Sequence, residues 1–270
     1  RLRPAAGQGA GPAGALVANP NCSTIQLVVA VQAVRLAFGL RRIFVATYQS
    51  ASGAGQKGID ALDAERRGGE AARAVFPARL FGNVVPQVDV ILEDGWTREE
   101  EKTLRETRRI LDLPELPVHG ACVRVPVDVG HSEAVYVETE RPVDVEEAKA
   151  ALRAFPGIVL VESEAEPPYP TALQAAGTDP VWVGRVRADR SEPRGLHLWV
   201  VADNLRKGAA TNAVQIAEAW WIRENGEADG AGEAAAAGGA LGATNRSARG
   251  TVGDGPPETA VRDRPGRRVR

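Results

Sequence analysis

The sequence predicts an α+β domain built on a mixed or antiparallel sheet. Strand-like and helix-like runs follow one another along the chain without strict βαβ alternation. No strand-like run leads through a Gly-x-Gly-x-x-Gly turn into a helix, so these residues carry no dinucleotide-binding fingerprint. At 270 residues the chain is long enough for one large domain or two small ones.

Helical periodicity and capping patterns place the helices. In chain order they are predicted at residues 24–38, 57–67, 97–111, 143–154 and 205–222. The first is mostly apolar and stops at Gly39. The third begins with a capping-box pattern, Thr97 and Glu100, and its polar composition predicts that much of it faces solvent. The fourth is amphipathic, and the fifth carries an apolar stripe that includes Trp220.

β-Prone runs between these helices supply the strands. They are predicted at residues 43–47, 116–127, 132–139, 158–162, 181–188 and 195–202. The second and third strands are expected to be neighbours in the sheet, because only a short connection around Gly130 separates them. Residues 76–86 are broken by Pro and Gly and are predicted to be irregular.

Both ends of the chain have compositions that predict disorder. Residues 1–15 are rich in Gly, Ala and Pro, and residues 224–270 contain no aromatic side chain. Such segments bury too little apolar area to offset the entropy of ordering the chain. The sequence contains no Met, which predicts that it is a fragment or the product of an altered reading frame.

Composition excludes several classes of partner. Lys and Arg total 33 against 35 Asp and Glu, so neither nucleic acid nor a membrane surface is an expected partner. No apolar run approaches the roughly 20 residues that span a bilayer. Two cysteines do not make a disulfide framework, and they fit a reducing cytoplasm.

Cys22 is the first candidate catalytic residue. It follows the turn-forming Asn19-Pro20-Asn21 and stands directly before the apolar run of the first helix. A helix N-terminus carries partial positive charge and free N–H groups, and both favour a thiolate over a thiol. A buried structural Cys is the alternative, but the polar helix-starting residues around Cys22 favour a nucleophile.

Arg124 is the second candidate. In a strand, Cys122 and Arg124 share one face, while Val123 and Val125 share the other. A guanidinium in such a strand needs an anion, and its fork suits a carboxylate. The alternative is an arginine paired on the surface.

Five blocks, in this order, resemble aspartate-semialdehyde dehydrogenase. They are residues 19–26 (NPNCSTIQ), 47–55 (TYQSASGAG), 122–126 (CVRVP), 130–133 (GHSE) and 202–210 (ADNLRKGAA). The resemblance implies the C-terminal domain of a glyceraldehyde-3-phosphate-dehydrogenase-like protein, with helices on one face of the sheet. Residues 16–203 would form the catalytic and dimerisation domain. Residues 204–223 would form a helix that docks on a Rossmann-type NADP-binding domain, most of which this sequence lacks.

The resemblance also implies a reaction. This is the NADPH-dependent reductive dephosphorylation of L-aspartyl 4-phosphate to L-aspartate 4-semialdehyde through a Cys thioester. It belongs to the biosynthesis of lysine (by way of diaminopimelate), threonine, methionine and isoleucine. NADP would be the cofactor, phosphate the released product and a cytoplasmic homodimer the assembly, with no metal. Because most of the nucleotide domain is missing, we expect this chain alone to be inactive.

Site residues follow from the same resemblance. Cys22 would be the nucleophile, and His131 would shuttle the proton, since an imidazole titrates near neutral pH. An isolated His is more often structural, but the sequence around His131 favours the catalytic role. The substrate would be bound by Gln49, Arg124, Glu99 and Lys102, and the cofactor by Ser52, Gly53 and Asn204.

Three alternatives stay open at this stage. Without the resemblance, Glu99 and Lys102 would be an ordinary exposed ion pair on one helix face. The chain could also be a non-catalytic module that keeps only the dimer surface. A related enzyme, N-acetyl-glutamyl-phosphate reductase, fits less well because of Asn21 before the thiol and Ser23-Thr24 after it.

Overall fold

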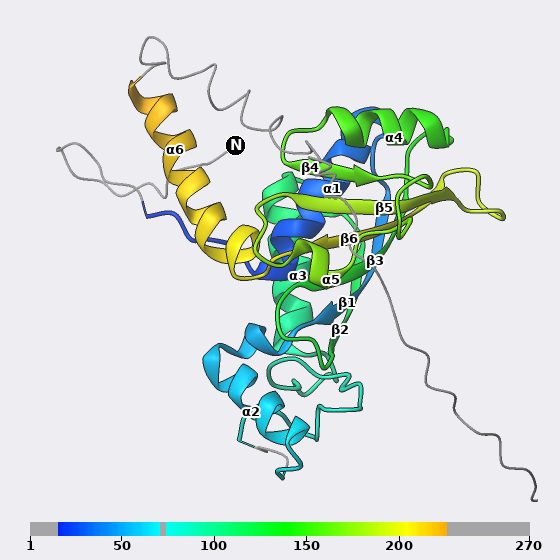
Figure 1. The fold of residues 1–270 in the computed structure, drawn as a ribbon. Helices are drawn as coiled ribbons and strands as arrows, with labels where there is room; N and C mark the ends of the chain where they lie inside the picture. The colour runs from blue at the N-terminus through cyan, green and yellow to red at the C-terminus, as the bar shows by residue number, and fades with distance from the viewer. Residues whose placement is uncertain (1–15, 71–73, 226–270) are drawn as a thin grey trace, which may run out of the picture. The chain divides into compact units, whose positions relative to one another are not determined.

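The computed structural model describes residues 16–70 and 74–225, with side chains as far as residue 222. Figure 1 shows the elements, which are α1 (Cys22–Phe38), β1 (Arg42–Gln49), the 3-10 turn η1 (Ala51–Ala54), α2 (Gln56–Arg66), α3 (Arg98–Leu111), β2 (Val118–Arg124), β3 (His131–Glu138), α4 (Val145–Ala154), β4 (Ile158–Val161), α5 (Ala172–Ala175), β5 (Val181–Ala188), β6 (Gly195–Ala202), the π-helical turn η2 (Arg206–Ala210) and α6 (Thr211–Asn225). The predictions for residues 1–15 and 226–270 lie outside the described residues. Residues 224 and 225 continue α6 instead of beginning a tail.

Within the described residues, six strands form one mixed sheet in the order β2-β1-β3-β6-β5-β4. The outer pairs β1–β2 and β4–β5 are parallel, and the pairs β1–β3, β3–β6 and β5–β6 are antiparallel. The mixed sheet confirms the predicted α+β class. The predicted bounds of β5 and β6 match the structure, whereas the short helix α5 was not predicted.

One predicted pairing is wrong. β2 and β3 are not neighbours, because β1 lies between them and pairs with both. Neighbouring strands lie about 4.8 Å apart, so residues 125–130 have to span only about 10 Å to skip one strand. The connection passes over the end of β1, where the Val125 N–H donates to the Gln49 carbonyl at 3.0 Å.

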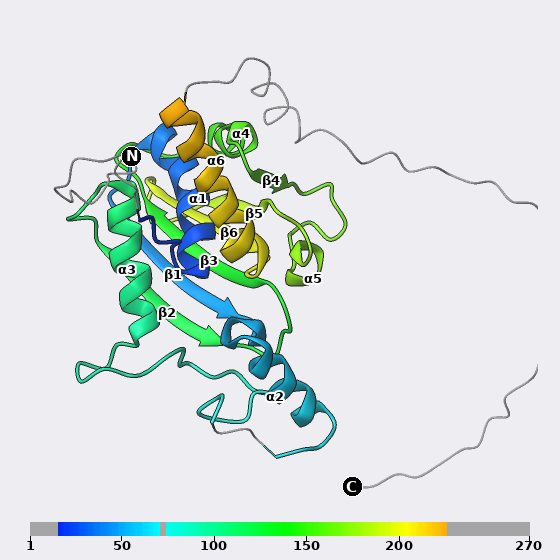
Figure 2. The same cartoon turned by 90° about the vertical axis from the view of Figure 1, so that its left-hand side faces the viewer.

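Helices α1, α3 and α4 cover one face of the sheet, as predicted. α1 packs against β3, β5 and β6, and Figure 2 shows it between α3 and α4. It is apolar on nearly every side, and Leu27, Val31 and Val34 are fully buried. A helix that is apolar all round belongs in a core. The main core therefore fills the space between α1 and the sheet, and it fixes where the first turn of α1 meets the strands.

Aromatic rings cross the opposite face of the sheet in a row. Successive ring centroids lie 5.0, 6.0 and 4.9 Å apart. The rings belong, from β2 across to β6, to His119, Phe44, Tyr136 and His197. The row lines an open groove of about 610 Å³ whose lining also includes Ala46, Ala121 and Ala134. We call the surface formed by the four aromatic residues and the three alanines the groove face.

The last predicted helix begins with an unpredicted turn. Residues 206–210 form η2, in which the Gly208 N–H donates to the Asp203 carbonyl at 2.9 Å, five residues back. α6 continues from it and carries the exposed apolar side chains Val214, Trp221 and Ile222. Docking of this helix on a nucleotide domain stays a prediction. None of the described helices is long and apolar enough to cross a membrane.

Candidate active site

The ends of four neighbouring strands, β2, β1, β3 and β6, lie side by side at one end of the sheet, beside the first turn of α1. Gln49 and Arg124 end the parallel strands β1 and β2 and are paired in register. His131 begins β3, which runs the other way, and is paired with Ala202 at the end of β6. The side chains of Gln49, Arg124 and His131 are buried at this end. Topology therefore brings together the three distant blocks that the sequence analysis joined to Cys22.

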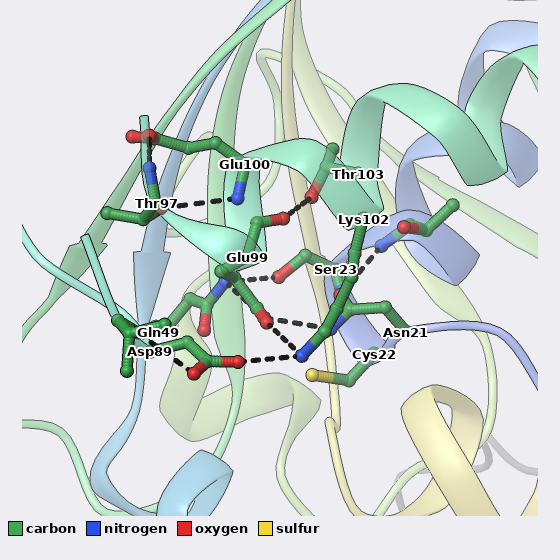
Figure 3. Close-up of polar contacts among 12 residues, drawn as sticks. Asn21, Cys22, Ser23, Gln49, Asp89, Thr97, Glu99, Glu100, Lys102 and Thr103 are labelled. Carbon is green, nitrogen blue, oxygen red and sulfur yellow. Dashed lines mark hydrogen bonds and ion pairs between the residues drawn. The ribbon is translucent and has the colours of Figure 1, made fainter. Parts of the chain in front are cut away.

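Asn21 fixes the position of Cys22. Its side-chain oxygen accepts hydrogen bonds from Ser23 N at 2.9 Å and Thr24 N at 3.5 Å, which makes Asn21 the N-cap of α1. The helix thus starts at Cys22, two residues earlier than predicted. Figure 3 shows Asn21 and Cys22 together at this first turn. An Asn N-cap satisfies two N–H groups that the helix itself leaves unpaired.

Cys22 and His131 are in direct contact. The sulfur lies 3.2 Å from His131 Nε2. On the other side of the ring, the backbone N–H of Ser50 donates to His131 Nδ1 at 3.1 Å, with Ser50 Oγ also 3.1 Å from it. A backbone N–H can only donate, so Nδ1 is an acceptor and the neutral ring carries its proton on Nε2. The proton of His131 therefore lies next to the sulfur.

Burial reverses the charge state expected for this pair. The pKa of the Cys22 thiol is raised to about 12, first by burial and then by the nearby negative charge of Glu99. Hydrogen bonding from the first turn of the helix acts in the opposite direction but is outweighed. The pKa of His131 is lowered to about 3 by burial and by the positive charge of Arg124. The expectation of a thiolate was wrong for this arrangement, which holds a thiol beside a neutral imidazole.

Arg124 is a buried cation beside this pair. It is 6% exposed, and its Nη1 donates to the Ser50 carbonyl at 2.7 Å. Among the described residues no carboxylate forms an ion pair with it, so the alternative of a paired surface arginine does not hold. Gly53 passes close by, because a Cβ there would lie 2.5 Å from Arg124 Nη1 and 3.3 Å from His131 Cε1. Only glycine fits this approach without moving the guanidinium.

Glu99 links the start of α1 to α3. One of its carboxylate oxygens accepts from Asn21 Nδ2 at 2.8 Å and from Gln49 Nε2 at 3.2 Å. The other lies 3.4 Å from Lys102 Nζ, which also pairs with Asp89 at 2.9 Å. Figure 3 shows these side chains converging beside Cys22. Glu99 is 5% exposed, so its pair with Lys102 is not the ordinary exposed ion pair of the alternative interpretation.

The three predicted cofactor residues differ in accessibility. Gly53 is exposed, whereas Ser52 and Asn204 are buried. The Asn204 side-chain oxygen accepts from Ser50 Oγ at 3.0 Å, Ser52 Oγ at 3.1 Å and Gly130 N at 2.9 Å. Gly53 thus offers the accessible surface next to His131, while Ser52 and Asn204 hold the loop behind it.

Sequence reasoning missed several residues of the site. Ser50 carries the backbone groups that contact both His131 and Arg124, and no side-chain pattern predicts that role. Asp89 lies between the irregular segment predicted at residues 76–86 and the helix predicted from residue 97, where no element or motif was predicted. Gly208 approaches Cys22 so closely that a Cβ would lie 3.1 Å from the Cys22 Cβ, which only the unexpected π turn explains. Among residues 16–70 and 74–225, no cluster of His, Cys, Asp and Glu could hold a metal ion.

The chain belongs to the semialdehyde dehydrogenase family. Residues 31–207 match the family described as the semialdehyde dehydrogenase dimerisation domain. Within it the resemblance to aspartate-semialdehyde dehydrogenase is confirmed. The aspartate-semialdehyde dehydrogenase of Shewanella violacea is 51% identical over 208 residues, which are 75% of this chain and 61% of that protein. The chain therefore spans about 61% of the length of this relative.

Solved structures agree with this family. The aspartate-semialdehyde dehydrogenase II of Vibrio cholerae, complexed with ASA, has a TM-score of 0.73 at 47% identity, covering 77% of this chain and 62% of its own. The aspartate-semialdehyde dehydrogenase of Candida albicans, solved with NADP, has a TM-score of 0.55 at 25% identity, covering 74% and 55%. These likenesses favour this family over N-acetyl-glutamyl-phosphate reductase.

Proposed function

We propose that this chain carries the acyl-transfer centre of an NADP-dependent aspartate-semialdehyde dehydrogenase. The overall reaction reduces L-aspartyl 4-phosphate to L-aspartate 4-semialdehyde and releases phosphate, in the biosynthesis of lysine, threonine, methionine and isoleucine. The observation that carries the proposal is the 3.2 Å contact between Cys22 Sγ and His131 Nε2, with the buried Arg124 beside it. A catalytic thiol of this kind requires a reducing compartment, such as the cytoplasm.

Cys22 is the nucleophile of the first step. Its sulfur attacks the acyl carbon of the substrate, the bond from that carbon to the phosphate oxygen breaks, and a thioester forms. The thiol proton leaves with the departing phosphate, so atoms and charge balance. In the resting protein the thiol is neutral, and the His131 Nε2–H stabilises negative charge as it develops on sulfur. Reactivity thus arises when substrate binds rather than from a preformed thiolate.

His131 then serves the reductive step. NADPH supplies the hydride that reduces the thioester carbon when it is bound. The Nε2–H of His131 is positioned to donate a hydrogen bond to the oxygen that gains charge at that carbon. When the carbon–sulfur bond breaks, that charge returns to the carbonyl group of the aldehyde and the sulfur takes a proton from solvent, so the neutral ring keeps its own proton. Gly53 borders this position without a side chain, so it is the residue of the predicted cofactor set that the nicotinamide ring would contact.

Polar and charged side chains around the thiol each bind a different group of the substrate. Arg124 binds the substrate carboxylate, because its guanidinium donates to the Ser50 carbonyl but forms no ion pair with any carboxylate among the described residues. Glu99 binds the amino group, and Gln49 orients the acyl group from between Glu99 and Ser23, to whose Oγ it donates at 2.7 Å. Lys102 contacts the phosphate. Arg124 and Glu99 both lie close enough to the nucleophile for their charges to act on the Cys22 thiol, which suits an amino acid with two charged groups.

Acyl transfer can be tested on this chain without any nucleotide. The chain is incubated with L-aspartyl 4-phosphate and digested, and the thioester is located by mass spectrometry and released with hydroxylamine. We expect the aspartyl mass on the Cys22 peptide, its loss in Cys22→Ser and its retention in Cys122→Ser. Cys122 is the control because it is the other thiol of the chain and its pKa is likewise raised to about 12, although it is buried whereas Cys22 is partly exposed. No adduct on Cys22, or an equal adduct on Cys122, would contradict the proposal.

The assembly that we propose is a homodimer formed through the groove face. The matching family is a dimerisation domain, and the groove face carries a row of four aromatic rings, of which Phe44 and His119 are exposed. Tyr136 and Phe44 present rings there that are suited to packing against a second copy. In a two-fold dimer the same residues would meet on both subunits.

A further inference from the structure

Lys102 is held by two carboxylates rather than one. Its Nζ lies 2.9 Å from Asp89 Oδ2 and 3.4 Å from Glu99 Oε2. Figure 3 shows Lys102 between the two. The Glu99 side chain is 7% exposed, whereas those of Asp89 and Lys102 are 29% and 40% exposed. The pair with Asp89 is therefore the one that an incoming anion can reach.

The chain holds Asp89 in an unfavourable conformation to make this contact. Its φ is 67°, in the left-handed region that non-glycine residues rarely occupy, although Asp tolerates it better than most. Its Oδ1 accepts from the Val90 N–H at 2.9 Å, and its carbonyl accepts from Gln87 Nε2 at 3.1 Å. The Val90 carbonyl in turn accepts from Arg98 N at 2.9 Å, at the start of α3. These bonds leave Oδ2 aimed at Lys102.

The charges of this cluster oppose anion binding. Asp89 and Glu99 carry two negative charges against the one positive charge of Lys102. The pKa of Asp89 is lowered, chiefly by its hydrogen bond from Lys102, so the carboxylate stays ionised at neutral pH. A phosphate dianion that approaches Lys102 meets a competitor already in place, and like charges at this distance repel.

We propose that Asp89 is a positioning residue that sets the affinity of the site for phosphate by competing with it for Lys102. This inference rests on the proposed function, in which Lys102 contacts the phosphate. Phosphate is the leaving group of the reductive reaction, so an unopposed ammonium would retain the product. Asp89 takes Lys102 back when phosphate departs, which weakens product binding.

The test is phosphate binding by the full chain and its Asp89→Asn variant. Asn keeps an oxygen that can accept from Val90 and tolerates the left-handed backbone, so the change removes the charge and replaces the oxygen that accepts from Lys102 with an amide NH2. Asp94→Asn is the matched control, because this exposed carboxylate of the same loop accepts only from Trp96 N among the described hydrogen bonds. Thermal unfolding is followed at increasing inorganic phosphate and constant ionic strength, which yields an apparent Kd. L-Aspartate, which lacks the phosphate, is titrated for comparison.

We expect Asp89→Asn to bind inorganic phosphate about tenfold more tightly, as the loss of a repelling charge implies. Asp94→Asn should bind phosphate as the unchanged chain does, and Lys102→Gln should lose phosphate binding. The binding of L-aspartate should not change in Asp89→Asn. Unchanged or weaker phosphate binding by Asp89→Asn overturns the inference, as does phosphate binding that survives Lys102→Gln. Absence of phosphate binding by every variant overturns it too, while the acyl transfer at Cys22 tests the proposed function separately.

Discussion

The reactivity of Cys22 depends on the balance between burial, Glu99 and the helix N-terminus. Because the negative charge of Glu99 helps to raise the pKa of the thiol, removing that charge should lower it. We predict that Glu99→Gln increases the rate of Cys22 alkylation by iodoacetamide at pH 8 by about threefold to tenfold, since one pKa unit is tenfold in thiolate. In the unchanged chain the rate should keep rising with pH through pH 9 without a plateau.

Glu101→Gln is the matched control for that experiment. Glu101 lies two residues on in α3 and pairs with Arg105 at 3.0 Å on the outer side of the helix. Its loss should leave the alkylation rate of Cys22 unchanged. A rate that levels off near pH 7 in the unchanged chain would show a preformed thiolate and refute the charge state described here.

At the residue scale, the sequence predicted which groups meet but not how they are charged. Cys22, His131 and Arg124 lie in motifs whose order and types are visible in the sequence. The pKa shifts depend on burial and on Glu99, which reaches the thiol from another helix. Ser50 was missed for a related reason, since its backbone rather than its side chain fixes the proton on His131.

At the scale of elements, the N-cap of α1 is the device that places the nucleophile. The side-chain oxygen of Asn21 accepts hydrogen bonds from two backbone N–H groups, and its Nδ2 donates one to the Glu99 carboxylate. We predict that Asn21→Ala lowers the free energy of unfolding by about 1 kcal/mol, the usual value for a lost cap. It should also change the alkylation rate of Cys22, because the first turn loses its fixed position.

The control is another cap far from the site. Asp144 caps α4 by accepting from Glu147 N at 2.8 Å. Asp144→Ala should lower the stability by a similar amount and leave the alkylation rate unchanged. Chemical denaturation and alkylation kinetics measure both effects. Equal alkylation rates in Asn21→Ala and the unchanged chain would show that the cap stabilises α1 without positioning the thiol.

Local patterns predicted most elements and missed what depends on partners. The capping box of Thr97 and Glu100 is present, and the α1 helix differs only in its first turn. The neighbours of β2 could not be read from chain proximity, because β1 inserts from earlier in the sequence. The π turn η2 was missed as well, because its residues continue the helical pattern predicted at 205–222 and nothing in their spacing marks a π turn.

At the scale of the whole molecule, the two faces of the sheet serve different purposes. The face under α1 is closed by the main core and carries the buried site residues at its edge. The aromatic row on the other face crosses four strands, so it exists only once the strand order is known. Neighbouring rings in the row are separated by 61 to 92 positions along the chain, for example 75 between Phe44 and His119, and no sequence pattern links them. Strand alternation could suggest the outward positions but not their alignment.

The groove face is the surface through which we propose that two copies of the chain meet. Ala121 is an exposed residue of β2 that lines the groove, so a charge there should not disturb the fold of one subunit. In a two-fold dimer it would bring a buried, unpaired carboxylate against each partner, which costs several kcal/mol. We predict that Ala121→Glu dissociates the dimer and weakens self-association at least a hundredfold, measured by analytical ultracentrifugation. Ala150→Glu, on the exposed side of α4, is the matched control and should remain dimeric. If the unchanged chain sediments as a monomer, or if Ala121→Glu dimerises as tightly as Ala150→Glu, the copies do not meet through this face.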